Sequence, residues 1–349
     1  MVMCLPIRFP GAYLHLHTGL RFSETAAERD SSALPSRGSD VHVRRTMEQH
    51  LYQILGRHRA EPLPERKPSW LKVKAPGGEN YLRIKGMMRE LGLHTVCEEA
   101  RCPNIGECWD HGTATFMILG DVCTRNCAYC AVSHGRPPSF DLAEPEKVAS
   151  AVAAMSLRHA VITSVDRDDL PDFGSHHFHE TIRLIHEMVP GCSVEVLVPD
   201  FQGSRDAIEH VLDARPEIYN HNTETVPRLY KKARPGGRYE RVMGIFRLAK
   251  AYAPDILTKT GIILGMSETI EEVIEVMKDL RSVDVDILTL GQYLKPSESH
   301  IALDRYYTPE EFRHLYDVGM SLGFRHVESG PLVRSSYHAW EQVQAAGVS

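Results

Sequence analysis

The sequence has no long apolar run and no excess of positive charge. None of its apolar stretches approaches the ~18 residues that a membrane span requires, so no membrane protein is predicted. Its 46 acidic and 40 basic side chains give a formal net charge of −6, which favours no nucleic-acid partner. With 42% hydrophobic and 25% charged residues among 349, the composition is that of a globular protein of one large domain or two.

Cysteine is not abundant, but it is clustered. Of the eight cysteines, six lie between Cys97 and Cys130, and only Cys4 and Cys192 lie elsewhere. Residues 1–22 lack the basic start and apolar core of a secretory signal, so reduced thiols that bind metal are favoured over a disulfide framework. We expect Cys4 and Cys192 to be inert.

Two parts of the chain differ in pattern. Residues 1–68 mix Pro, Arg and Ser without a sustained period, and we expect a weakly ordered extension with one short helix at 46–57. From residue 115 onward, short apolar runs alternate with helical stretches. The predicted strands are 115–121, 159–165, 192–198, 217–220, 256–264 and 286–290. The predicted helices are 145–156, 177–188, 205–214, 239–251 and 268–281.

This alternation of strands and helices indicates an α/β fold. Parallel neighbours need crossover connections, so a parallel sheet with helices outside it is predicted, as a partial or full barrel. Periodicity alone does not separate an open barrel from a doubly wound sheet. Chemistry in such barrels lies at the C-terminal ends of the strands, and Cys123 comes two residues after the first predicted strand. A site at the mouth of the barrel is therefore predicted.

The second triplet, Cys123, Cys127 and Cys130, offers three thiolates from one short loop. Two kinds of metal site fit this pattern. A closed zinc site would take His134 as its fourth ligand. A four-iron, four-sulfur cluster would be held at three irons and would leave the fourth iron free to bind another molecule.

This triplet resembles the signature of the radical S-adenosylmethionine (SAM) superfamily. The shared features are the spacing Cys-x3-Cys-x2-Cys after the first strand and an aromatic residue, Tyr129, before the last cysteine. The resemblance implies that the open iron chelates SAM and that an electron from the cluster cleaves it to a 5′-deoxyadenosyl radical. Radical chemistry of this kind has to come from a cofactor, because no side-chain base removes hydrogen from an unactivated methylene.

The first triplet, Cys97, Cys102 and Cys108, predicts a second cluster. Its gaps of four and five residues do not match the ferredoxin pattern, so simple electron transfer is disfavoured. Pro103 and Gly106 suggest that this stretch is a loop rather than a regular helix.

Residues 97–108 and 116–125 together resemble the lipoyl synthase family. Further motifs of that family occur at 163–170, 220–222, 226–230, 288–294 and 330–337, so the resemblance covers roughly residues 68–340. It implies that Ser336, in the run Arg334-Ser-Ser-Tyr337, is the fourth ligand of the second cluster. Oxygen is a harder and poorer match to this site than thiolate, so a weakly held iron would let the cluster donate sulfur.

Several residues near predicted strand ends are candidates to bind SAM. They are Thr163, Glu195, Asn220, Gly261 and Gly265, the last two within a stretch that resembles the adenine-contacting pattern of the superfamily. Lys259 is a further candidate to face the pocket. The charged run 166–169 follows the second strand and is expected at the mouth.

The resemblance implies a sulfurtransferase that inserts two sulfur atoms, at C6 and C8, into a protein-bound octanoyl group. The implied cofactors are two 4Fe-4S clusters and SAM. The implied partners are octanoylated lipoyl carrier domains (2-oxoacid dehydrogenase E2 subunits and the glycine cleavage H protein), a flavodoxin- or ferredoxin-type reductant and iron–sulfur assembly proteins. Two alternatives are another radical SAM enzyme with an auxiliary cluster and a non-catalytic metal-binding module.

We expect four segments along the chain. They are the extension 1–68, a segment 69–112 that carries the first triplet, a radical SAM partial barrel at 113–325, and a tail 326–349 that carries the serine motif. The two ends are expected to cover the barrel mouth. A cytoplasmic location is expected, with a mitochondrial one as the alternative.

Overall fold

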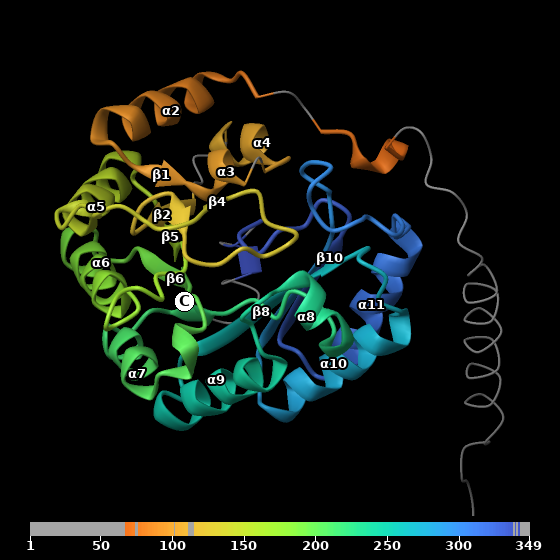
Figure 1. Ribbon diagram of the computed structural model, residues 1–349. Coiled ribbons are helices and arrows are strands. Elements are labelled where there is room, and N and C mark those ends of the chain that lie inside the picture. The colour runs from red at the N-terminus through yellow and green to blue at the C-terminus, as the bar shows by residue number, and fades with distance from the viewer. Residues whose placement is uncertain are drawn as a thin grey trace, which may run out of the picture. The chain divides into compact units, whose positions relative to one another are not determined.

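A parallel sheet of neighbouring strands forms the centre of the fold. The computed structural model describes residues 67–73, 76–100, 102–110, 115–337, 339 and 341–342 (Figure 1). All six predicted strands are present and lie side by side in chain order. They are β2 (Thr115–Ile118), β5 (His159–Ser164), β6 (Ser193–Leu197), β7 (Ile218–Asn220), β8 (Leu257–Leu264) and β9 (Ile287–Gln292).

Two further strands, which the sequence analysis did not predict, extend this sheet. β1 (His94–Thr95) pairs antiparallel with β2, and β10 (His326–Gly330) pairs parallel with β9. The strand order β1-β2-β5-β6-β7-β8-β9-β10 never reverses. A doubly wound sheet would reverse its order at a switch point, so the fold is an α/β partial barrel rather than a doubly wound sheet.

Helices cover the outside of the strands (Figure 1). The five predicted helices are present, each with ends within two residues of the prediction: α5 (Glu144–Met155), α6 (Ser175–Met188), α7 (Arg205–Asp213), α9 (Tyr239–Tyr252) and α10 (Ile270–Ser282). Two longer helices, α2 (Glu79–Leu91) and α11 (Pro309–Ser321), were not predicted. Thr308 and Glu311 form a reciprocal capping box at the start of α11, which is a signal that the sequence carries.

Short elements complete the described part of the chain. They are η1 (Ser69–Leu71), α3 (Val96–Glu99), α4 (Ile105–Asp110), β3 (Val122–Cys123), β4 (Ser133–His134), η2 (Phe201–Gly203), η3 (Pro227–Leu229) and α8 (Tyr230–Ala233). β3 and β4 form a separate two-stranded parallel sheet.

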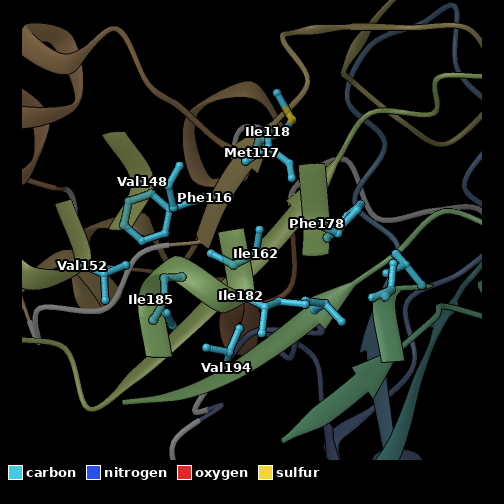
Figure 2. Close-up of a cluster of buried hydrophobic side chains, with 14 of the residues drawn as sticks. Phe116, Met117, Ile118, Val148, Val152, Ile162, Phe178, Ile182, Ile185 and Val194 are labelled. Atoms are coloured by element: carbon cyan, nitrogen blue, oxygen red, sulfur yellow. The ribbon is translucent and has the colours of Figure 1, made fainter. Parts of the chain in front are cut away.

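The core lies between the sheet and the helices outside it. Figure 2 shows Val148 and Val152 of α5 and Ile182 of α6 beside Phe116 of β2 and Ile162 of β5, all at most 1% exposed. Each such side chain contributes roughly 1.5–3 kcal/mol to the free energy of unfolding when it is fully buried. The repeated strand-and-helix unit therefore gives the rigid frame on which the loops at the strand ends are carried.

The expectation of a loop at the first triplet was wrong. Cys97 lies in α3 and Cys108 in α4, and only Cys102 lies in the link between these helices. Pro103 lies in the link between the two helices, after the end of α3 at Glu99 and two residues before the start of α4, so it interrupts neither helix. Gly106 is inside α4, and a Cβ at that position would lie 2.9 Å from the Cα of Pro76. This glycine serves close packing rather than a turn.

Other expectations lie outside the described residues. They are the helix at 46–57, most of the extension 1–68, and Cys4. The chain divides into two units, Met1–Arg59 and Ala60–Ser349, and every described residue belongs to the second. None of the described helices combines the length and the hydropathy that a membrane span needs.

Candidate active site

A cavity of about 670 Å³ lies at the C-terminal ends of the barrel strands. Thr163 of β5, Leu197 of β6 and Gly291 of β9 line it from the strands. All six clustered cysteines also line this cavity, and so do residues 333–337. Segments far apart in the sequence therefore meet at the barrel mouth, where the sequence predicted the chemistry.

The loop of the second triplet is tied to two other segments through its backbone. The N–H of Ala128 donates to the carbonyl oxygen of Ala233 at 2.8 Å, and the N–H of Ile301 donates to that of Ala128 at 2.8 Å. His300 places its Nε2 2.9 Å from the carbonyl oxygen of Cys130. These contacts fix the path of the loop between its cysteines.

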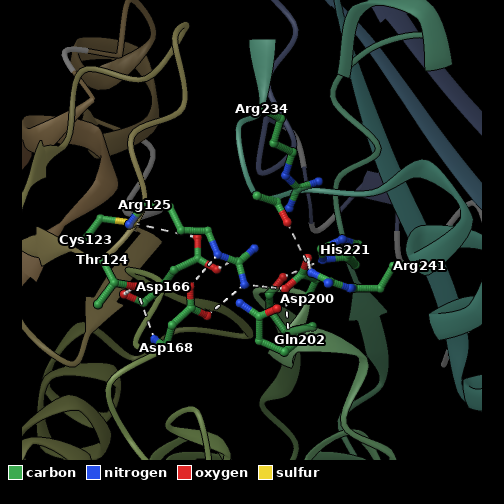
Figure 3. Close-up of polar contacts among 12 residues, drawn as sticks. Cys123, Thr124, Arg125, Asp166, Asp168, Asp200, Gln202, His221, Arg234 and Arg241 are labelled. Carbon is green, nitrogen blue, oxygen red and sulfur yellow. Dashed lines mark hydrogen bonds and ion pairs between the residues drawn. The ribbon is translucent and has the colours of Figure 1, made fainter. Parts of the chain in front are cut away.

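Arg125, between Cys123 and Cys127, anchors the same loop through its side chain (Figure 3). Its Nε and Nη2 donate to the two oxygens of Asp168, both at 2.7 Å, and Nη2 also donates to Asp200 at 2.6 Å. Its Nη1 lies 3.3 Å from Oδ1 of Asp166. A buried guanidinium in the cysteine loop thus joins carboxylates that follow two different strands.

The arginines of this network keep the carboxyl group of Asp200 in its charged form. Burial acts to raise the pKa of Asp200, but Arg125 and Arg241 outweigh it and hold this pKa well below its usual range. Arg241 donates to the second oxygen of Asp200 at 2.6 Å. The charged run 166–169 lies at the mouth of the barrel, as expected. Within it, Asp166 and Asp168 both form ion pairs with Arg125.

The first triplet is held by short helices rather than by one loop. Thr95 accepts a hydrogen bond from the N–H of Glu98 at 3.3 Å and so caps α3, which carries Cys97. Burial is the largest cause that raises the pKa of Cys108, and the charges of Cys97 and Cys102 raise it further. All three cysteines line the same cavity.

The C-terminal tail completes the cavity next to the first triplet. Asn104 donates its Nδ2 hydrogen to the carbonyl oxygen of Leu332 at 2.7 Å, which ties the tail to the cysteine segment. Ser335 donates to Oδ1 of Asn222 at 2.9 Å, which ties it to the barrel. Ser336 lines the cavity together with all three cysteines of the first triplet.

Two glycines in the strands make room for this tail. A Cβ on Gly291 of β9 would lie 2.1 Å from the carbonyl oxygen of Val333. A Cβ on Gly261 of β8 would lie 3.0 Å from Oγ of Ser335. Residues 333–335 therefore lie directly against the inner face of the barrel.

Comparison with known proteins identifies the family. The model of the radical SAM superfamily matches residues 117–280, and that of the N-terminal domain of lipoyl synthase matches residues 40–102. The lipoyl synthase of Rubrobacter xylanophilus is 60% identical over 280 residues, which are 80% of this chain and 87% of that protein. That of Koribacter versatilis is 57% identical over 282 residues, which are 81% and 93%. The chain belongs to the lipoyl synthase family.

Lipoyl synthase function, as a radical SAM sulfurtransferase, follows from this membership. It decides against the other radical SAM enzymes and against the non-catalytic metal-binding module. Among solved structures, that of Streptococcus suis SuiB bound to S-adenosylmethionine has a TM-score of 0.50 at 10% identity, over 72% of this chain and 61% of that chain. This likeness supports the fold alone.

Membership of the superfamily implies a 4Fe-4S cluster and SAM, and the second triplet fits such a cluster. Its three thiols line one cavity, and the N–H of Arg125 donates to Sγ of Cys123 at 3.4 Å, a contact that supports a thiolate. Burial raises the pKa of Cys123 to about 11 and that of Cys127 to about 12. At neutral pH a metal has to displace the proton from each thiol.

The thiols of the first triplet also have raised pKa values. Burial raises the pKa of Cys97 to about 11 and that of Cys108 to about 12.

Within the described residues, no three His, Cys, Asp or Glu side chains are grouped closely enough to bind a single metal ion. His134 also lines the cavity, but it is an exposed residue of β4.

The candidates for SAM contacts fall into two groups. Thr163 and Gly261 line the cavity, and Thr163 donates its hydroxyl hydrogen to the carbonyl oxygen of Leu197 at 2.8 Å. Glu195, Asn220 and Gly265 are not among the residues that line it. As cofactor contacts, all five remain predictions.

Glu195 and Asn220 lie in a buried polar cluster inside the barrel. Lys259 donates to Oε2 of Glu195 at 2.8 Å, and Asn220 donates to Oε1 at 2.7 Å. Lys259 and Glu195 are both 0% exposed. Lys259, a candidate to face the pocket, thus forms a buried ion pair instead.

Gly265 has a structural requirement of its own. Its φ of +117° is a conformation that side chains rarely adopt, and a Cβ would lie 2.4 Å from Nε2 of Gln292. This position therefore selects glycine for backbone reasons.

Some polar residues of the cavity were not among the predicted site residues. Tyr129, Glu224 and Arg234 all line it. Burial raises the pKa of Glu224, whereas the charge of Arg234 acts to lower it. Glu224 also has a positive φ of 70°, uncommon for a residue with a side chain. The sequence signal was weak, because charged residues after a strand are ordinary loop residues.

Proposed function

We propose that this chain inserts sulfur at C6 and C8 of an octanoyl group attached to a lipoyl carrier domain. Two 4Fe-4S clusters and SAM would serve the reaction. The observation that carries the proposal is that both cysteine triplets and Ser336 line one cavity of about 670 Å³. A substrate chain inside it would have access to both.

The residues have distinct tasks in this proposal. Cys123, Cys127 and Cys130 would hold the cluster that binds SAM, and the triplet Cys97, Cys102 and Cys108 with Ser336 would hold the auxiliary cluster. When bound, these groups supply hydrogen abstraction from unactivated carbon and the inorganic sulfur that is inserted. Ser336 contributes a hard oxygen ligand at a site otherwise made of soft thiolates, which favours loss of the iron it binds.

The apolar side chains of the cavity suit the substrate. Val96, Met117, Val132 and Val165 all line it, and Val96 precedes Cys97 while Val132 comes two residues after Cys130. An octanoyl chain is apolar, so its burial against these side chains contributes to binding, at about 0.8 kcal/mol for each buried methylene. This arrangement supports a substrate that lies between the two clusters.

We further propose the division into an extension 1–68, an auxiliary-cluster segment 69–112, a barrel 113–325 and a tail 326–349. In support, Cys97, Cys102 and Cys108 precede β2, and Ser336 follows β10. The proposed carriers are 2-oxoacid dehydrogenase E2 subunits and the glycine cleavage H protein. A flavodoxin- or ferredoxin-type reductant, iron–sulfur assembly proteins and a cytoplasmic location complete the proposal.

The test is a reaction of the full chain, reconstituted anaerobically. We expect about eight irons and eight sulfides per chain, as for two four-iron clusters. With reductant, SAM and an octanoylated carrier peptide, the product should carry two sulfur atoms. A fully loaded protein that cleaves SAM but yields no thiolated peptide would refute the sulfur-insertion proposal.

A further inference from the structure

The segment that carries the first triplet is bound to the C-terminal tail at two points. The first is Asn104, which lies between Cys102 and Cys108 and is 3% exposed. Its Nδ2 donates to the carbonyl oxygen of Leu332 at 2.7 Å. Its own carbonyl oxygen accepts a hydrogen bond from the N–H of Cys108 at 2.9 Å, which fixes Asn104 to α4. A buried hydrogen bond therefore joins the cysteine segment to the tail four residues before Ser336.

The second point of attachment is Tyr337. Its hydroxyl oxygen lies 3.3 Å from each carboxylate oxygen of Glu107, to which it donates its hydrogen. Glu107 immediately precedes Cys108 in the chain. The backbone of Tyr337 is also held, because its carbonyl oxygen accepts a hydrogen bond from Nε2 of the fully buried Gln342 at 2.7 Å. Since Tyr337 directly follows Ser336, the two attachments lie on either side of that serine along the chain.

The barrel holds the same part of the tail. Ser335 donates to Oδ1 of Asn222 at 2.9 Å. The N–H of Tyr337 donates to the carbonyl oxygen of Arg334 at 2.9 Å, which closes a turn that contains Ser336. Contacts before and after Ser336 thus restrict how far its hydroxyl can move within the cavity that the first triplet also lines.

A serine oxygen needs such restriction more than a cysteine sulfur does. Oxygen is a harder ligand and a poorer match than thiolate for the iron of a sulfide cluster, so its bond to iron does less to keep the ligand in place. Contacts behind a metal ligand orient it, and their removal typically weakens metal binding by about 10–100-fold. A ligand that is already ordered also loses little conformational entropy when it binds.

We propose that Asn104 and Tyr337 are positioning residues that hold the hydroxyl of Ser336 on the iron of the auxiliary cluster. Tyr337 acts through Glu107. The inference rests on the proposed function, since it requires a cluster on the first triplet with Ser336 as the fourth ligand. Asn104 and Glu107 each lie within two residues of a cysteine of that triplet, so their contacts with the tail set the spacing between the thiolates and the serine oxygen.

The test compares the rates at which a chelator removes iron from the full chain reconstituted with both clusters. SAM is present throughout to occupy the open iron of the barrel cluster. Ser336→Ala gives the rate for a missing ligand. We expect Tyr337→Phe to lose iron from the auxiliary cluster about fivefold faster than the unchanged chain, and Asn104→Ala about tenfold faster, because its hydrogen bond is buried. In both variants, the electron paramagnetic resonance signal of the reduced auxiliary cluster should shift towards that of Ser336→Ala.

The same two substitutions in the Ser336→Ala background separate positioning from a general loosening of the fold. If Asn104 and Tyr337 act through Ser336, neither substitution changes the rate further once the serine is gone. Equal acceleration in both backgrounds would mean that these residues stabilise the cysteine segment itself. That result would overturn the inference and leave the proposed function intact, and so would an unchanged rate in either single variant.

Matched variants control for the chemistry of the changes. Tyr252→Phe removes a hydroxyl that donates to Asp213 at 2.6 Å, and Tyr252 is not among the residues that line the cavity, so its rate should not change. Glu107→Gln keeps an acceptor for Tyr337 and should also leave the rate unchanged, whereas Glu107→Ala should match Tyr337→Phe. An unchanged rate in Glu107→Ala would contradict the role of Tyr337.

Failure of the inference and failure of the proposed function are distinguishable. If Ser336→Ala loses iron no faster than the unchanged chain, Ser336 is not a ligand, and the ligand assignment of the proposed function falls together with the inference. If Asn104→Ala does not fold, Tyr337→Phe decides alone, since that variant lacks only one partly exposed hydroxyl group.

Discussion

The two cysteine triplets share one cavity but are built in different ways. The second triplet lies in one short loop, and Arg125 inside that loop binds the carboxylates of Asp168 and Asp200. The first triplet is spread over α3, a link and α4, and residues 333–337 of the tail line the same cavity. One site is organised by its own loop and the barrel beneath it. The other exists only when the two ends of the described chain meet.

This difference has a chemical consequence. A cluster that has to survive many turnovers benefits from a rigid binding site, and the buried ion pairs of Arg125 make the site at the second triplet rigid. In the proposed function, the cluster on the first triplet gives up its sulfur and has to be rebuilt. A binding site assembled from separate segments of the chain is suited to that. The following changes are designed to affect one triplet and leave the other intact.

The largest effects should come from the cysteines themselves. Cys108→Ala should lose about four of about eight irons and all sulfur insertion, while 5′-deoxyadenosine still forms from SAM. Cys127→Ala should lose both activities, because the cluster that binds SAM is gone. Iron analysis and quantification of 5′-deoxyadenosine measure the two results. Cys192→Ala is the control, since Cys192 is buried outside the cavity. Loss of SAM cleavage in Cys108→Ala would show that the triplets are not independent.

Ser336→Cys tests the proposal that Ser336 is a weak ligand of the cluster on the first triplet. A thiolate should hold the iron more firmly than the serine oxygen, so we expect a complete cluster that no longer donates sulfur. The measurement is the sulfur content of the octanoylated peptide after a single turnover. Ser335→Cys changes the neighbouring hydroxyl, which binds Asn222, and should retain part of the activity. Normal turnover of Ser336→Cys would remove the explanation based on a labile iron.

Arg125→Gln should affect the second triplet alone. The substitution leaves the carboxylates of Asp166, Asp168 and Asp200 without their shared cation, which costs roughly 3–5 kcal/mol when a buried ion pair is broken. We expect the barrel cluster to be lost or bound weakly, while the auxiliary cluster remains. Electron paramagnetic resonance with and without SAM distinguishes the two clusters. The control is Arg183→Gln, which breaks ion pairs on the exposed face of α6 and should leave both clusters intact.

Gly291→Ala should affect the first triplet alone. The added Cβ would lie 2.1 Å from the carbonyl oxygen of Val333, so the tail has to move. Overpacking of this kind costs typically ~1–3 kcal/mol. We expect weaker retention of the auxiliary cluster during exposure to a chelator, with normal SAM cleavage. Gly244→Ala in α9, where no atom lies within 4 Å of the added Cβ, is the matched control. Equal chelator sensitivity of the two variants would mean that the tail does not hold the cluster.

The smallest effect at neutral pH concerns the buried ion pair of Glu195 and Lys259 inside the barrel. Burial acts to raise the pKa of Glu195, but Lys259 and His159 outweigh it and lower this pKa from 4.5 to about 2. A depressed carboxyl pKa stabilises the fold above pH 4.5, and this contribution, about 3 kcal/mol, is lost as the pH falls towards 2. Thermal unfolding between pH 7 and pH 3 measures the loss.

The double variant Glu195→Gln, Lys259→Met removes both charges of this pair. A buried ion pair is often replaced at little cost, so its stability at pH 7 should be close to that of the unchanged chain. Its unfolding should depend less on pH below 4.5. Identical pH profiles for the two proteins would show that the pair does not titrate as described.

The sequence by itself determined the strands and outer helices of the barrel and singled out the cysteines that we propose bind metal. Its strands and outer helices follow from local periodicity, because each repeated unit buries one apolar face. The second triplet could also be recognised in the sequence, because its three cysteines lie within eight residues. The helical form of residues 96–110 was missed, because short helices around Pro103 depend on what they pack against.

Only the tertiary structure decided which groups meet. It brings the tail with Ser336 into the cavity that the first triplet lines, gives Arg125 its carboxylate partners, and pairs Glu195 with Lys259 instead of exposing them to the cavity. These contacts join residues that are far apart along the chain, and no local pattern encodes them. They form because the curved sheet brings the strand ends to a common mouth, where burial allows charges to persist only beside a partner.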